Sequence, residues 1–159
     1  MIVVVDASTL INLANGEALS AVLSLTGMRF LVSGAVRDES RSIAAAIKDA
    51  VAAGKLELVD DALITLRAFT EAKRQLRLGD GETECILAAE QLGCSIACDD
   101  RAARAASIAR FGQARLIGSI GLLRLARQEG LVTRADAFAS YELMRQRGGY
   151  LPSVAEQEF

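Results

Sequence analysis

The regular alternation of short apolar runs with longer helical patterns is the feature that most restricts the fold of this 159-residue chain. Runs rich in Val, Ile and Leu are expected to form strands at residues 2–5, 29–32, 56–59, 95–98 and 114–117. The segments between them repeat apolar residues at helical spacing. Strands that alternate with helices in this way indicate βαβ units and a parallel sheet.

Local signals predict where the helices begin and end. A helix is expected from Ser8 to Leu25, with a break or bend at Gly16. Asp60 or Asp61 is expected to cap a helix that runs to about Leu76, and Asp80 to cap the next one. The further helices are expected around residues 34–39, 43–53, 82–92, 101–111, 119–129 and 133–146. No linker or repeat divides the chain, so we expect one domain over 1–159 with an irregular tail at 148–159.

Composition excludes several classes of protein. With 52% hydrophobic but only 4% aromatic residues, the chain favours a helix-rich interior of Ala, Leu, Ile and Val. Its apolar runs are far shorter than the roughly 20 residues that cross a bilayer, and its N-terminus lacks a basic region, so we expect a cytoplasmic protein with no membrane partner. Three cysteines without any histidine favour buried, reduced thiols over disulfides or a Cys/His zinc site.

Charge is distributed unevenly along the chain. Residues 1–100 carry nine Lys/Arg against fifteen Asp/Glu, whereas residues 101–147 carry nine Arg against three acids. This asymmetry suggests a metal-binding acidic cluster beside a phosphate-binding surface, although ordinary solvated helix faces explain it equally well. Arg101 and Arg104 follow the last acidic pair by one helical turn, where they could contact a nucleic-acid backbone or simply stand exposed.

Acidic residues follow the two most apolar predicted strands. Asp6 follows the first, and Asp99 and Asp100 follow the fourth. Ligands of open parallel sheets gather outside the carboxyl ends of strands. Glu82, at the start of the helix before the fourth strand, and Glu39, after the second, are expected near the same edge. Crowded carboxylates repel unless a cation neutralises them, and without histidine the set favours Mg²⁺ or Mn²⁺. Each acid also has a simpler explanation when it is taken singly. Asp6 and Asp100 could cap the helices that follow them. Glu82 could interact favourably with the dipole at the start of its helix, and Glu39 could be an ordinary surface acid.

The motifs resemble those of the PIN-domain nucleases, which include the VapC-type toxins of prokaryotic toxin–antitoxin pairs. The matching stretches are VVVDASTLINLA at the start, SGAVRDE at 33–39, LGDGETECILAAEQLG at 78–93 and ACDDRAARAAS at 97–107. LIGSIGLLRLARQEGLV at 116–132 is similar to a PIN-like subgroup with a G-x-G-E motif and an extra helical C-terminal part.

The resemblance implies a three-layer α/β/α domain and a Mg²⁺- or Mn²⁺-dependent ribonuclease site. By position, Asp6, Glu39, Glu82 and Asp100 match the family's acids, with Asp99 as a further ligand whose order relative to Asp100 stays open. Ser8 matches a supporting hydroxyl residue, while the family's threonine before the last acids is here Cys98. The resemblance also implies an RNA substrate and a small antitoxin partner. The apolar helix from Ser8 to Leu25 could form the face of a homo-oligomer such as a dimer, although core packing is its default explanation.

Other classes fit the residues less well. Haloacid-dehalogenase-type phosphatases need a second acid two residues after the first, where this chain has Ser8. Receiver domains need a late lysine, and none occurs after Lys73. Neither phosphate-binding glycine motif, G-x-G-x-x-G or G-x-x-x-x-G-K-[ST], is present. A PIN-like fold kept as a catalytically inactive nucleic-acid- or partner-binding module remains the alternative to a nuclease.

Overall fold

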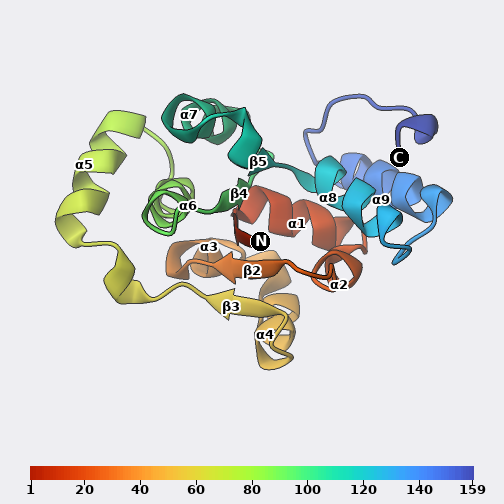
Figure 1. Cartoon of the computed structure of the whole chain (residues 1–159), viewed down its shortest axis with the longest axis horizontal. Coiled ribbons are helices and arrows are strands. Elements are labelled where there is room, and N and C mark those ends of the chain that lie inside the picture. Colours follow the sequence, from red (N-terminus) through yellow and green to blue (C-terminus); the bar gives the residue numbers. More distant parts are fainter.

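A computed structural model of residues 1–159 has a five-stranded sheet at its centre (Figure 1). The strand order is β3-β2-β1-β4-β5, and all neighbouring strands are parallel. The strands are β1 (Ile2–Val5), β2 (Arg29–Val32), β3 (Leu56–Leu58), β4 (Ser95–Ala97) and β5 (Leu116–Ile117). The predicted parallel α/β fold and all five predicted strands are therefore confirmed. β5 is shorter than expected because Gln113–Arg115 forms a 3-10 turn before it.

β1 and β4 lie side by side at the point where the strand order reverses. Their register pairs Val5 with Ala97, so the next residues, Asp6 and Cys98, are neighbours at the carboxyl edge. The Asp6 backbone N–H extends the ladder by donating to the Ala97 carbonyl at 2.9 Å. In open α/β sheets a crevice for ligands forms at such a reversal. The fold therefore brings the two acidic segments of the sequence to one place.

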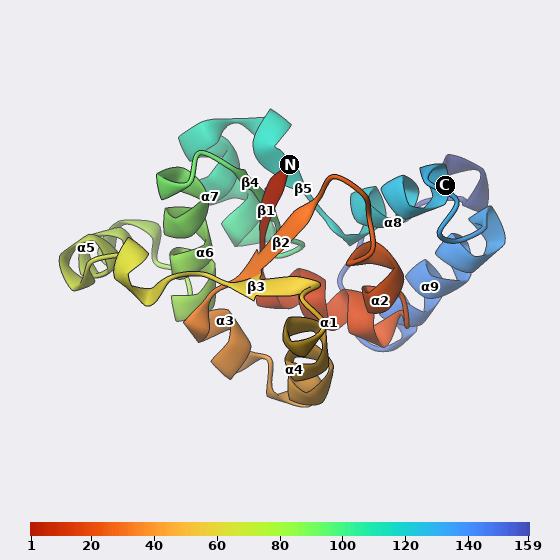
Figure 2. The same cartoon turned by 60° about the horizontal axis from the view of Figure 1, so that its bottom comes forward.

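Helices cover both faces of the sheet, giving three layers (Figure 2). On one side, α6 packs against β1 and β4 and α7 against β5; on the other, α8 and α9 pack together with α1 and α2. α4 packs against β3, and α3 meets α6 near the carboxyl edge. The helices are α1 (Ala7–Asn15), α2 (Leu19–Val22), α3 (Gly34–Glu39), α4 (Ala44–Ala52), α5 (Leu66–Leu76), α6 (Asp80–Gln91), α7 (Arg101–Phe111), α8 (Ser119–Gln128) and α9 (Arg134–Gln146).

Two predicted helix boundaries are wrong. The helix expected from Asp60 or Asp61 to Leu76 is divided: Asp60 caps only the 3-10 turn Asp61–Leu63, Ile64 is extended, and the Thr65 hydroxyl caps α5. Asp80 does not cap α6, since Gly79 holds the N-cap position and Asp80 pairs instead with Lys73 at 2.6 Å. The predicted break at Gly16 is confirmed, because α1 ends at Asn15.

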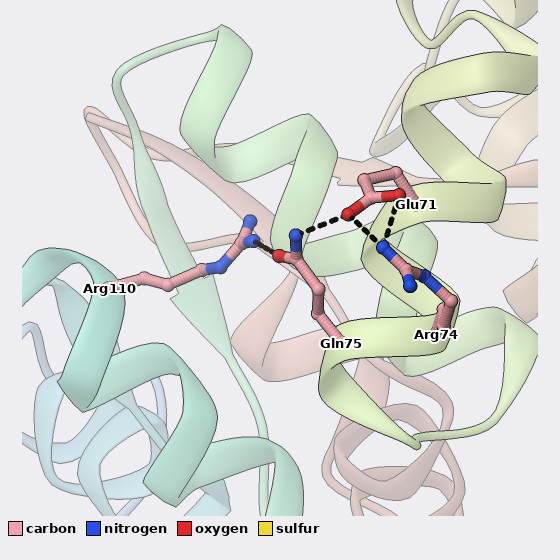
Figure 3. A network of polar contacts seen from close by, with 4 residues as sticks. All are labelled: Glu71, Arg74, Gln75 and Arg110. Atoms are coloured by element: carbon pink, nitrogen blue, oxygen red, sulfur yellow. Dashed lines mark hydrogen bonds and ion pairs between the residues drawn. The ribbon is translucent and has the colours of Figure 1, made fainter.

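α5 lies at the periphery, where it packs against α6 (Figure 1). A polar network joins its C-terminal half to α7 (Figure 3). Arg110 reaches from α7 to the Gln75 side chain at 3.5 Å, and Gln75 and Arg74 both donate to Glu71. Exposed pairs of this kind contribute between about 0 and 1 kcal/mol each, so the network adds little to the packing of α5 against α6.

The tail beyond α9 is held by one buried tyrosine. Tyr141 is fully buried, and its hydroxyl donates to the Pro152 carbonyl at 2.9 Å and accepts from the Val154 N–H at 3.2 Å. The last residue, Phe159, is also buried and packs against Tyr141 and Phe138. The segment between Gly148 and Ala155 has neither helix nor strand, and its hydrogen bonds to Tyr141 attach it to α9.

All three cysteines are free and buried, as predicted. No helix in the structure combines the length and the apolar character that crossing a bilayer requires.

Gly16 is required for the contact between α1 and α9. A Cβ at this position would lie 2.7 Å from the Ser140 carbonyl oxygen and 2.7 Å from the Met144 side chain. We expect Gly16→Ala to lower the free energy of unfolding by about 1–3 kcal/mol, because the backbone of α9 has to move. Gly34→Ala is the control, since a Cβ there meets nothing closer than 3.7 Å. Urea unfolding that finds the two variants equally stable would contradict this packing.

Candidate active site

Asp6 is the most buried acid of the carboxyl edge, with 2% of its surface exposed. Its Oδ2 accepts hydrogen bonds from the Ser8 backbone N–H at 3.1 Å and the Ser8 hydroxyl at 2.6 Å, and so caps α1. Its Oδ1 is buried and has no hydrogen-bond partner. Loss of solvent raises the pKa of Asp6, and the bonds from Ser8 offset only part of that rise. Capping therefore accounts for one oxygen of this carboxylate and leaves the other unpaired.

Ser8 connects the ends of β1 and β4. Its hydroxyl donates to Asp6 and accepts from the backbone N–H groups of Asp99 at 3.0 Å and Asp100 at 3.2 Å. A hydroxyl has one hydrogen and two lone pairs, so all three of its hydrogen-bonding positions are used. This single side chain thereby fixes the loop after β4 relative to Asp6.

Cys98 lies beside Asp6 at the end of β4. It is fully buried, with its sulfur 3.6 Å from Asp6 Oδ2 and 3.9 Å from the Ser8 oxygen. Burial raises the pKa of the thiol, and the Asp6 charge raises it further. Cys98 is thus a neutral thiol, which offers Asp6 a weaker hydrogen bond than a hydroxyl would.

Asp99 and Asp100 have different contacts although they are adjacent. Asp100 caps α7 through one oxygen, Oδ1, which accepts from the Ala103 N–H at 2.8 Å. Both oxygens of Asp99 are engaged: Oδ1 accepts from the Ser119 N–H at 2.9 Å, and Oδ2 accepts from the Asn12 amide at 2.8 Å and from the Ser119 hydroxyl. Asp99 therefore ties α1 to the start of α8, whereas Asp100 keeps a free oxygen.

Glu82 lies in the first turn of α6 with an oxygen, Oε2, that is buried and unpaired. Loss of solvent is the largest cause of the raised pKa of Glu82. Repulsion from Asp6, Asp100 and Glu39 raises it further, and the nearby Gly79 backbone N–H lowers it in part. Gly79 also gives the carboxylate room, since a Cβ there would clash with Oε2. Three other acids thus act on Glu82 across the same edge.

Glu39 supports the loop that carries Glu82. Its Oε1 accepts from the Gly81 backbone N–H at 3.0 Å, and a Cβ on Gly81 would clash with its other oxygen. Glu39 is exposed, unlike Asp6. Its contacts are those of a residue that holds the start of α6 against α3.

The two predicted phosphate-binding arginines lie differently. Arg101 is exposed in the first turn of α7 and makes no polar contact. Arg104 is half-buried, and its Nη1 donates to the Cys98 carbonyl at 2.7 Å and more weakly to the Ile117 carbonyl at 3.4 Å. Arg104 therefore lies at the ends of β4 and β5 with its guanidinium held in one orientation.

The donor set suits a hard divalent cation. In the conformation described, no three Asp, Glu, Cys or His side chains are placed so that they could hold a metal ion together. Two carboxylates nevertheless keep buried, unpaired oxygens, Asp6 Oδ1 and Glu82 Oε2. Buried acceptors are normally paired, and a cation is a partner that also removes their mutual repulsion. Carboxylate oxygens without histidine are ligands for Mg²⁺ or Mn²⁺, so the chemistry of these side chains suits such an ion.

Sequence reasoning missed two residues of this edge, Asn12 and Ser119. Both donate to Asp99, from α1 and from the start of α8. Asn12 lies one turn after Ser8, on the same face of α1, so helical spacing from Ser8 could have identified it. Nothing in the sequence marked Ser119, because its partner lies twenty positions away in another loop.

Comparison with known proteins identifies the family of the chain. No curated protein and no solved structure matches the chain significantly. The model of the family DUF3368, described as a PIN domain, matches residues 2–158. PIN domains are generally nucleases and typically use divalent metal ions, in keeping with acids at the carboxyl edge of a parallel sheet. The chain therefore belongs to the PIN-domain family.

Proposed function

We propose that this protein is a Mg²⁺- or Mn²⁺-dependent ribonuclease whose active site is the carboxyl edge of β1 and β4. One observation carries the proposal: Asp6 is almost fully buried, yet its Oδ1 has no hydrogen-bond partner. A buried ionised carboxylate costs folding free energy unless it is paired, and a cap needs only the other oxygen. The unpaired oxygen of Glu82, the acid that Asp6 and Asp100 repel, supports the same interpretation.

Asp6, Glu82 and Asp100 are the residues that we assign to the ion. Each has an oxygen outside any hydrogen bond, whereas both oxygens of Asp99 are occupied. A divalent ion bound there would supply an activated water and neutralise charge on the phosphodiester. Ser8 holds Asp6 and the loop after β4 in place, and Glu39 holds the start of α6. Asp99 positions the start of α8. Arg101 and Arg104 bind the phosphate backbone of the substrate.

Cleavage of RNA in the presence of metal tests the proposal. Purified protein is incubated with mixed-sequence RNA and with single-stranded DNA, in Mn²⁺, in Mg²⁺ and in EDTA. We expect cleavage of RNA that requires the metal and that Asp100→Asn abolishes. If wild type and Asp100→Asn leave the RNA equally intact at every metal concentration, the fold serves as an inactive binding module and the ribonuclease proposal fails.

We further propose that the protein acts as the toxin of a toxin–antitoxin pair, as a homo-oligomer held inactive by a small antitoxin protein. The support is the resemblance to VapC-type toxins, joined to a nuclease-type site. Induced expression in bacteria is expected to arrest growth, and Asp100→Asn is expected to relieve the arrest. Normal growth with active protein in the cells would contradict the toxin role, and light scattering would decide the oligomeric state.

A further inference from the structure

A cavity lined in part by Asp99 lies next to the acidic edge. Its volume is about 360 Å³, at the lower end of the range of small-ligand pockets. One wall comes from β5 and the start of α8, and the opposite wall from the tail. The apolar lining residues are Leu116, Ile117, Ile120, Leu151, Pro152 and Val154. Two guanidinium groups, of Arg104 and Arg124, complete the lining.

Arg104 enters this cavity in a fixed orientation. Its Nη1 donates to carbonyl oxygens at the ends of β4 and β5. Its other N–H groups make no hydrogen bond within the protein. Gly118 makes room for it, because a Cβ there would lie 3.0 Å from Arg104 Nη1 and 2.6 Å from Asp99 Oδ1. The Arg104 guanidinium is thus a cationic group that is already oriented at the cavity.

Arg124 approaches from α8 without a satisfactory partner. Its side chain is 39% exposed, but its Nε is buried and makes no hydrogen bond. The nearest acid, Glu158 of the tail, is 3.8 Å from the guanidinium, which is too long for a hydrogen bond. The guanidinium also stands 5.7 Å from the centre of the Phe159 ring. An anionic group from outside the chain would supply the acceptor that Nε lacks.

Asp99 also lines the cavity, with both of its oxygens held by hydrogen bonds from neutral groups. Asn12 and Ser119 donate to its two oxygens. The cavity therefore combines two guanidinium groups and one hydrogen-bonded carboxylate with apolar walls. A phosphate satisfies the guanidinium groups, and a nucleoside covers apolar surface that a free phosphate leaves bare.

We propose that this cavity binds one nucleotide of an RNA strand, with its phosphate between Arg104 and Arg124 and its nucleoside against Ile120 and the tail. The inference rests on the proposed ribonuclease function, which it deepens by naming a substrate subsite beside the acidic edge. Tyr141 fixes the second wall through Pro152 and Val154. The subsite is thus formed before the substrate arrives.

Binding of mononucleotides in EDTA tests the subsite without any cleavage. Amide chemical shifts of the wild-type protein are recorded during titration with adenosine 5′-monophosphate, uridine 5′-monophosphate, adenosine and inorganic phosphate. We expect both nucleotides to shift the amides of residues 118–121 and 151–154, and to bind more tightly than adenosine or phosphate. If no probe moves these amides, or phosphate alone binds as tightly as the nucleotides, the inference is overturned.

A matched pair of variants assigns the binding to Arg124. Arg124→Gln is expected to weaken nucleotide binding about tenfold, since it removes one charged hydrogen-bond donor group. Arg134→Gln removes the same charge from the exposed start of α9 and is expected to leave binding unchanged. Equal weakening in both variants would indicate general charge attraction and contradict the subsite.

Cleavage kinetics separate this inference from the proposed function. In an active enzyme, Arg124→Gln is expected to raise KM for RNA about tenfold while kcat changes by less than about twofold. An unchanged KM in a protein that cleaves RNA overturns the subsite and leaves the ribonuclease intact. Nucleotide binding in a protein that cleaves nothing overturns the ribonuclease but keeps the cavity as a nucleotide site.

Discussion

Asp6→Asn is expected to lower metal-dependent cleavage of RNA by about three orders of magnitude. The variant keeps the shape of the side chain but removes the charge that would hold the ion, and a loss of about 4 kcal/mol in transition-state stabilisation corresponds to that factor. Single-turnover cleavage in Mn²⁺ measures it. Asp49→Asn, which removes a charge from exposed α4, is the control and is expected to retain full activity.

The same substitution is not expected to destabilise the protein when metal is absent. The folded-state pKa of Asp6 lies above its ordinary value, so ionisation at neutral pH costs folding free energy. An asparagine avoids that cost and can still accept the Ser8 N–H that caps α1. In EDTA the Tm of Asp6→Asn should therefore equal or exceed that of the wild type. A large fall in Tm would mean that lost activity reflects unfolding.

Ser8→Ala is expected to lower the free energy of unfolding by about 3 kcal/mol. It removes the hydroxyl that donates to the buried Asp6 carboxylate, and it leaves the Asp99 and Asp100 N–H groups without their acceptor. Cleavage should also fall by at least about tenfold, because the loop after β4 is no longer fixed relative to Asp6. Urea unfolding and cleavage assays measure the two effects.

Two further serine variants are controls for the effects of Ser8→Ala on stability and activity. Ser8→Thr keeps the hydroxyl and is expected to retain most of the stability and activity. Ser20→Ala, at an exposed position of α2 where the hydroxyl makes no hydrogen bond, is expected to change stability by less than about 0.5 kcal/mol. If Ser8→Ala behaves like Ser20→Ala, Ser8 does not hold the two strand ends together.

Much of the architecture could be predicted because the strands are short, apolar and separated by helical patterns. Val3, Val4 and Val5 form a buried strand, and the sequence places an acid directly after it. The same pattern recurs before Asp99. Since parallel strands present their carboxyl ends together, the meeting of these acids at one edge follows from the fold class.

The partners of each acid could not be predicted, because they depend on register and loop paths. Spacing from Glu82 favours Asp100 as the main ligand, but it does not say that Asn12 and Ser119 bind Asp99 and leave Asp100 one free oxygen. The start of α5 was missed for a similar reason. Asp60 and Thr65 are both good N-caps, and only the extended conformation of Ile64 between them decides that the helix begins after Thr65.

Calorimetric titration with Mn²⁺ tests the central claim most directly, namely that Asp6 and its neighbours form a cation site. Wild type and Asp49→Asn are expected to bind the ion with equal affinity, while Asp6→Asn and Glu82→Gln bind it at least about tenfold more weakly. Equal binding of Mn²⁺ by all four proteins, or binding by none of them, would contradict the account.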